Sequence, residues 1–245
     1  MAREWKMAWL PLVFILLGIT QPIIMYYLPS ILKTLDGSEG IMIDPNMAAQ
    51  QGGEVLASTL GSQFDQLGVI ILVVSMMGIV QSEKANGMLA FILTRPVSIR
   101  SYIGGKIVSN YLFVVLGVTL GYVASYLYVH FLFTTIPFST LLLALLLYLL
   151  WVLFIVSFTM MISTIFHSQG VIALISIVFL MGLRIIVGLS PVIDHMNPAS
   201  MSVYAMDVLI AGTIDPEFVW SMIATLLLTA LTINMAGRWL SEKRF

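Results

Sequence analysis

The pattern of apolar and polar positions divides the chain into six long apolar stretches separated by polar segments. The apolar stretches cover approximately residues 8–32, 66–82, 107–133, 140–166, 170–189 and 218–237. A helix needs roughly 20 mostly apolar residues to cross about 30 Å of hydrocarbon. A helix also satisfies its own backbone hydrogen bonds, which lipid cannot do. The pattern therefore predicts an all-α membrane protein with six transmembrane helices in a single domain, residues 1–245.

The composition agrees with lipid as the main solvent. Of the 245 residues, 60% are hydrophobic and 9% are charged, and the mean hydropathy is +1.02. Soluble domains carry about 25% charged residues. The net charge of -1 gives no reason to expect a nucleic-acid partner. The absence of cysteine excludes a disulfide scaffold, a thiolate metal site and a cysteine nucleophile.

The basic residues predict the orientation, because short loops rich in Lys and Arg stay in the cytoplasm. Nine of the eleven basic residues fall before the first stretch, between the second and third, or after the sixth: Arg3, Lys6, Lys84, Arg95, Arg100, Lys106, Arg238, Lys243 and Arg244. Nine of the twelve acidic residues fall on the other side: Asp36, Glu39, Asp44, Glu54, Asp65, Asp194, Asp207, Asp215 and Glu217. Six crossings with both termini in the cytoplasm satisfy both distributions.

Two of the expected outer loops are long. Residues 33–65 are rich in Gly and other turn-forming residues and show little core-forming pattern. Residues 190–217 contain a moderately apolar stretch, 199–212, that is too short to span. This stretch fits either a buried re-entrant or interfacial helical hairpin or an ordinary folded outer loop.

The most informative polar segment is residues 83–106, which read EKANGMLAFILTRPVSIRSYIGGK. After Gly87, an apolar cluster at helical spacing predicts a short amphipathic helix. Pro96 stops this helix, since proline disfavours helix at the residue before it. Ser98 can cap a second helix that begins at Ile99, and Arg100 and Lys106 can reach anionic headgroups. Such a segment can lie in the membrane interface or fit a groove on a partner protein.

The same segment resembles the permease subunits of type-2 ABC transporters, which are mostly exporters. In that family the loop between spans two and three has the form Glu, a few residues, Gly, an apolar run, then Pro-x-Ser. The positions that match this form or lie in its apolar run are Glu83, Gly87, Met88, Leu89, Phe91, Ile92, Leu93, Pro96 and Ser98. The chain departs from the family at Ala90-Phe91, where an acidic residue and a leucine are common.

The resemblance implies that this segment is a coupling helix between helices 2 and 3, which docks in a cleft of an ABC ATPase subunit. It also implies a second permease subunit, as a homo- or heterodimer, in a bacterial plasma membrane. The chain has no Walker A motif, because Gly104-Gly105-Lys106 continues with Ile107. We therefore expect no enzymatic activity and no cofactor in this chain, with ATP and Mg bound by the partner subunit. The alternative is a non-transporting membrane scaffold or sensor component.

Other chemistry-bearing residues are few. Arg184 lies within the fifth apolar stretch, where it either snorkels or pairs with Asp194, or else lines the path of an anionic substrate. The three histidines, His130, His167 and His195, are too dispersed to predict a metal site. Apart from Arg184 the predicted spans hold essentially no ionisable residues, which disfavours an intramembrane enzyme or an ion-coupled transporter. Residues 117–121 form a GxxxG motif that permits close helix approach. The motif fits either a specific dimer contact or a chance occurrence of this spacing.

Overall fold

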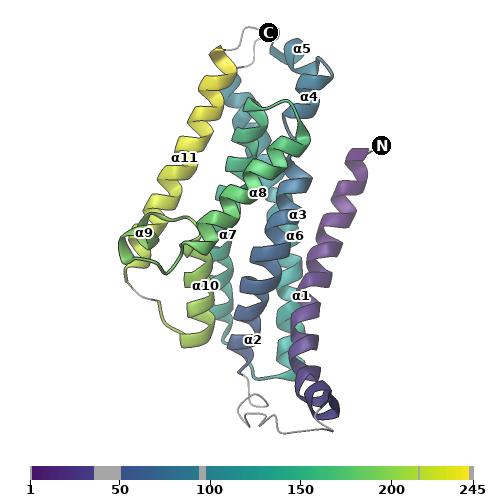
Figure 1. Cartoon of the computed structure of the whole chain (residues 1–245), viewed down its shortest axis with the longest axis vertical. Helices are drawn as coiled ribbons and strands as arrows, with labels where there is room; N and C mark the ends of the chain where they lie inside the picture. The colour runs from purple at the N-terminus through teal and green to yellow at the C-terminus, as the bar shows by residue number, and fades with distance from the viewer. Residues whose placement is uncertain (1, 36–50, 94–97, 215, 243–245) are drawn as a thin grey trace.

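The computed structural model describes residues 2–35, 51–93, 98–214 and 216–242, and these ranges form helices and turns without any strand. The elements are α1 (Ala2–Leu35), α2 (Gly52–Ser58), the π-helix η2 (Thr59–Gly68), α3 (Val69–Met76), α4 (Gln81–Ala85), α5 (Met88–Leu93), α6 (Ile99–Leu132), α7 (Phe138–Ile165), α8 (Gln169–Ile185), α9 (Pro191–Met196), α10 (Ser200–Ala211) and α11 (Phe218–Glu242). The long helices run side by side in one elongated bundle (Figure 1).

Five segments of the described chain are helical, long and apolar enough to cross a membrane: Ala8–Ile31, Gly52–Ala85, Ile99–Leu132, Phe138–Ile165 and Phe218–Glu242. They correspond to five of the six predicted spans. The prediction of an all-α membrane protein is therefore confirmed at this level.

The fifth predicted span differs from the prediction. Helix α8 has 17 residues and ends at Ile185, so it is about 26 Å long and falls short of the hydrocarbon thickness. The chain then turns through Gly188, whose φ of +88° lies in the left-handed region that glycine tolerates. The predicted extension to residue 189 counted these turn residues as helix because they are apolar.

The second span begins earlier than predicted. Residues 52–65 were expected in an outer loop, but α2 and η2 carry them into the bundle ahead of α3. Val55, Leu56 and Phe64 are at most 1% exposed. Their glycine-rich surroundings suggested turns, whereas the glycines allow close packing against neighbouring backbone. A Cβ added at Gly53 would lie 2.1 Å from the carbonyl oxygen of Leu209.

Residues 190–217 contain two short helices, α9 and α10, which pack on different partners, α9 on α11 and α10 on α7 and α2. Helix α10 packs against α7 and α2, and its Met201, Ala205 and Val208 are buried. In Figure 1 it lies beside α2 in the half of the bundle away from α4 and α5. Helix α11 then runs back to the end where the C-terminus lies.

Helices α1 and α6 form the most extensive helix pair. A Cβ added at Gly18 would lie 2.1 Å from the carbonyl oxygen of Gly121, and one added at Gly121 would lie 2.4 Å from that of Phe14. The GxxxG motif of residues 117–121 thus packs α6 on α1 within one chain. This use explains the motif without a dimer contact.

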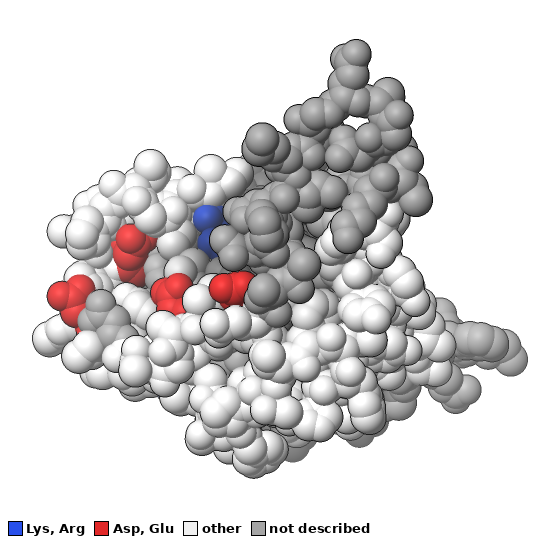
Figure 2. All heavy atoms as spheres, turned by 90° about the horizontal axis from the view of Figure 1, so that it is seen from below, with Lys and Arg blue, Asp and Glu red and all other residues white. Residues whose placement is uncertain are grey.

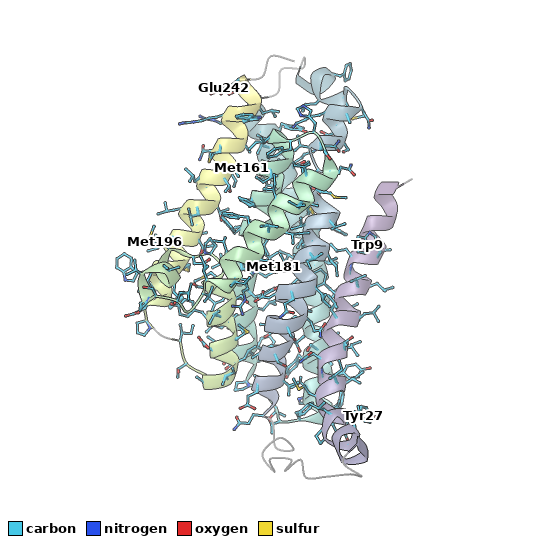
Figure 3. All side chains as sticks on the ribbon, viewed as in Figure 1. Trp9, Tyr27, Met161, Met181, Met196 and Glu242 are labelled. Carbon is cyan, nitrogen blue, oxygen red and sulfur yellow. The ribbon has the colours of Figure 1, made fainter. Side chains whose placement is uncertain are left out.

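Aromatic side chains lie near both ends of α1 and of α11. Trp9 and Tyr27 lie towards opposite ends of α1 (Figure 3), and 18 residues of helix separate them by about 27 Å. Trp220 and Trp239 are a similar distance apart on α11. The two helices are staggered, since Trp220 shares a groove with Met196, which lies at the height of Trp9 in Figure 3. The four residues therefore do not mark two common membrane interfaces.

Candidate functional site

The turn between α3 and α4 is held by a buried serine of α7. The Ser163 hydroxyl accepts hydrogen bonds from the backbone N–H groups of Val80 (3.3 Å) and Gln81 (3.1 Å) and donates to the carbonyl oxygen of Met77 (3.0 Å). Ser163 is fully buried. One side chain therefore satisfies three backbone groups where the helix is interrupted, and it fixes the base of the segment that resembles a coupling loop.

Helix α4 is also tied to the turn between α7 and α8. Lys84 donates to the carbonyl oxygens of Thr164 and Phe166, which lie at the C-terminal end of α7. These carbonyls have no partner within the helix, and the helix dipole favours a cation there. Gln81 donates to the carbonyl oxygen of His167 at 2.8 Å and accepts from Gln169 at 2.9 Å. These contacts tie α4 to the end of α7 and to the start of α8.

An ion pair joins α4 to α6. The Lys106 ammonium lies 2.7 Å from the Glu83 carboxylate, and the Tyr102 hydroxyl donates to the same carboxylate oxygen. Lys106 also donates to the carbonyl oxygen of Ile79. We expected Lys106 to reach lipid headgroups, but its charge is used within the protein. Glu83 therefore fixes the orientation of the segment from inside.

Gly87 separates α4 from α5. Its φ of +67° is the left-handed conformation that most residues avoid, and it redirects the chain into the six residues of α5. Leu89 is 1% exposed, whereas Met88 is 53% and Phe91 is 62% exposed. Helix α5 thus inserts one apolar side chain into the bundle and presents two others outward.

The remaining predicted coupling residues are placed less fully. Ile92 and Leu93 belong to α5, but their side chains lie outside the described residues, as does Pro96 altogether. Ser98 caps α6 as predicted, accepting a hydrogen bond from the backbone of Ser101 at 3.2 Å. The structure therefore places α4 and α5 at the end of the bundle where α11 ends (Figure 1).

A second polar site lies inside the bundle. The Arg184 Nε of α8 donates to Asp65 Oδ2 of η2 at 2.8 Å, and the Ser202 hydroxyl of α10 donates to the same oxygen. Tyr148 of α7 also interacts with this carboxylate. The Asp65 side chain is 0% exposed and that of Arg184 is 25% exposed. Four segments of the chain therefore meet at one carboxylate.

This arrangement corrects two expectations. Arg184 pairs with Asp65 and not with Asp194, whose carboxylate instead accepts a hydrogen bond from the backbone N–H of Gly188 at 2.8 Å. Asp65, expected in an outer loop, is a buried acid within a span. The statement that the spans hold essentially no ionisable residue besides Arg184 is therefore wrong.

Asp65 escaped notice because the glycine- and glutamine-rich residues before it were assigned to an outer loop. Leu56, Leu60 and Phe64 are nevertheless buried at intervals of four, a spacing typical of one face of a helix. That spacing was the available signal. The identity of the partner residue was not available, since 119 positions separate Arg184 from Asp65.

His195, in the outer segment, lies close to Glu217 and not to its neighbour in sequence, Asp194. His195 Nε2 lies 3.1 Å from a carboxylate oxygen of Glu217, and both residues border an open groove of about 530 Å³ between α9 and α11. Its other lining residues are mainly apolar and include Met196, at the edge of the bundle in Figure 3. Among the described residues, no three His, Asp or Glu side chains are grouped to hold a metal ion.

Comparison with known proteins gives two matches. The model of a family described as "Protein of unknown function (DUF2705)" matches residues 46–244. The chain is also 34% identical over 233 residues to the uncharacterized transmembrane protein YxlG of Bacillus subtilis (strain 168), covering 92% of this chain and 89% of that protein. The relative's description agrees with the membrane assignment.

Proposed function

Since this chain belongs to the DUF2705 family, we propose that it and its relatives are membrane-spanning permease subunits of ATP-driven ABC exporters. A separate ABC ATPase subunit would bind ATP and Mg, and a second permease subunit would complete the pathway. The protein would lie in a bacterial plasma membrane with six crossings and cytoplasmic termini, α8 being the short crossing. Its alternative role is a non-transporting scaffold or sensor.

The observation that carries this proposal is the construction of α4 and α5. Gly87 directs α5 outward at the end of the bundle, and α5 exposes Met88 and Phe91 while Leu89 anchors it. A short helix that presents apolar side chains from an anchored base is suited to a groove on a partner. The basic residues around it support a cytoplasmic position for that partner.

The contacts behind α5 supply a means of transmission. Glu83 ties α4 to α6 through Lys106, and Lys84 ties it to the turn that leads into α8. Ser163 fixes the connection to α3. Closure of two ATPase subunits beneath α5 would therefore move α3, α6 and α8 together. An isolated loop lying on lipid would have no need of these three ties.

We still propose that Arg184 lies beside the substrate path, but as one partner of an ion pair. Its charge is balanced by Asp65 at 2.8 Å, so an anionic substrate would have to compete with a buried carboxylate. Replacement of Arg184 by Gln, followed by transport measurements once a substrate is known, tests this role. Unchanged transport and assembly would remove Arg184 from the path.

Co-purification tests the proposed function. The affinity-tagged protein, extracted from its native membrane in mild detergent, should retain an ATP-binding subunit with a Walker A motif, identified by mass spectrometry, and the complex should hydrolyse ATP. Phe91→Asp should reduce the retained subunit at least about tenfold, because it places a charge in the docking helix.

Phe138→Asp is the matched control, since Phe138 is 72% exposed and begins α7 at the other end of the bundle. It should leave the retained ATPase unchanged. An equal loss in both variants, or no ATPase in the wild-type preparation, would contradict the proposal. A retained ATPase whose hydrolysis is insensitive to the permease would favour the scaffold or sensor role.

A further inference from the structure

The Asp65 carboxylate connects parts of the chain that are remote in sequence. Arg184 lies 119 positions away at the end of α8, and Ser202 lies 137 positions away near the start of α10. Between these two residues the chain forms the outer segment containing α9. One buried oxygen therefore holds both ends of this segment against η2.

The contact is completed unevenly. Asp65 Oδ1 is buried and makes no hydrogen bond of ordinary geometry with a described residue, although Tyr148 of α7 also interacts with this carboxylate. The Arg184 guanidinium donates to Asp65 Oδ2 through Nε, and the Arg184 side chain is 25% exposed. Buried ion pairs often add little stability compared with well-packed apolar residues. An ion pair that leaves one oxygen unsatisfied suggests a use in which the contact changes.

The element that carries Asp65 is itself unusual. η2 is a π-helix of ten residues, and π-helical segments are rare and occur frequently at functional sites. It continues into α3, which leads to the α4 base fixed by Ser163. A movement of α4 and α5 would therefore reach Asp65 along one helical segment.

The surface of α2 and η2 against α10 is closely packed. A Cβ added at Gly61 would lie 2.7 Å from the Met206 sulfur, and one added at Gly53 would lie 2.1 Å from the carbonyl oxygen of Leu209. The Asp65 carboxylate adds the polar contact that joins η2 to both α8 and α10. Figure 2 shows the nearby end of the molecule, where acidic groups lie beside recessed basic atoms.

We infer that Asp65 is a positioning residue for transport: it holds Arg184 and Ser202 so that the outer segment stays closed against η2, and this contact opens when the ATPase subunits act on α5. The inference rests on the proposed function for the cause of opening. The closed contact itself does not depend on it. Asp65 acts through its two partners and needs no contact with substrate.

Disulfide formation between Gly61→Cys and Met206→Cys tests the closed contact. The natural chain has no cysteine, so no other thiol competes. With a mild oxidant in membranes, this pair should cross-link rapidly in the wild-type background. Asp65→Asn and Arg184→Gln should each slow cross-linking at least about fivefold, and Ser202→Ala, which keeps both charges, at least about twofold.

Thr59→Cys with Ser125→Cys is the control pair. Their hydroxyl oxygens lie 3.1 Å apart and join η2 to α6, a contact that the inference leaves closed. Its cross-linking rate should be the same in every background, which also reports that each variant is folded. If Asp65→Asn disturbs the control pair, Ser202→Ala decides the question. Equal rates for the 61–206 pair in wild type and Ser202→Ala would then overturn the inference.

Nucleotide separates this inference from the proposed function. In the complex with its ATPase, a non-hydrolysable ATP analogue should slow the 61–206 cross-link and not the 59–125 cross-link. If the substitutions slow the 61–206 cross-link but nucleotide does not, Asp65 is a fixed brace and the opening is refuted. If no ATPase binds, the proposed function fails, while the comparison of substitutions still decides whether Asp65 positions the segment.

Discussion

At the scale of single residues, Gly87 and Asp65 each have a property that other residue types would not supply. Gly87 adopts a φ of +67° with no other atom near its Cβ position, so the backbone conformation and not crowding requires glycine. Asp65 is a fully buried acid whose charge is balanced by Arg184. Both are apparent only when the local backbone is known, because glycine and acids also occur in ordinary loops.

Removal of both partners of the buried pair should cost less stability than the two single removals added together. Asp65→Asn leaves the Arg184 cation without its anion, and Arg184→Gln leaves a carboxylate in an apolar interior. Breaking a buried pair costs about 3–5 kcal/mol, and the partial exposure of Arg184 should reduce the first value. The double variant should lose less stability than the sum of the single variants. Thermal unfolding in detergent measures this coupling, and additive losses would mean that the pair does not interact.

At the scale of elements, helix contacts follow from where glycines permit two backbones to approach. Gly18 and Gly121 bring α1 and α6 together, and Gly53 does the same for α2 and α10. The sequence predicted the long helices because apolar length is a local property. It did not predict these partners, because pairing depends on residues more than 100 positions apart, nor η2, because the glycines and glutamines of this segment suggested a loop.

Gly121→Ala should separate α1 from α6 slightly and destabilise the protein by about 1–3 kcal/mol, as overpacked cores do. The new Cβ would lie 2.4 Å from the carbonyl oxygen of Phe14. Gly105→Ala in the same helix meets nothing within 4 Å and should be neutral or slightly stabilising, since alanine favours helix. A fluorescence-detected melting series compares the two. Similar melting temperatures would show that α1 and α6 can accommodate the added methyl group at little cost.

At the scale of the whole molecule, five long helices and a shorter sixth place α4, α5 and both described chain ends towards one end of the bundle (Figure 1). The charge distribution predicted this grouping, because three basic clusters must share one aqueous side. It misjudged the opposite end, where Asp65 counted as a loop acid. A count of charges along the sequence does not distinguish an acid buried inside a span from an acid exposed in a loop.

Thiol labelling in intact cells tests the orientation. Met88→Cys should resist a membrane-impermeant maleimide until the cells are opened, because α5 is expected in the cytoplasm. Phe138→Cys, at the start of α7, should react from outside, since Phe138 is 72% exposed at the other end of the bundle. Rapid labelling of position 88 in intact cells would invert the topology and exclude a cytoplasmic ATPase on α5.

The glycine contact between α1 and α6 also constrains the order of biosynthesis. Gly18 leaves the ribosome about a hundred residues before Gly121, which is roughly 5 to 20 seconds at bacterial and eukaryotic elongation rates. During that interval the first helix must reside in lipid without its principal partner, although three prolines interrupt its hydrogen bonding. The nascent chain is therefore most vulnerable to membrane quality control between the insertion of its first segment and the completion of residue 121.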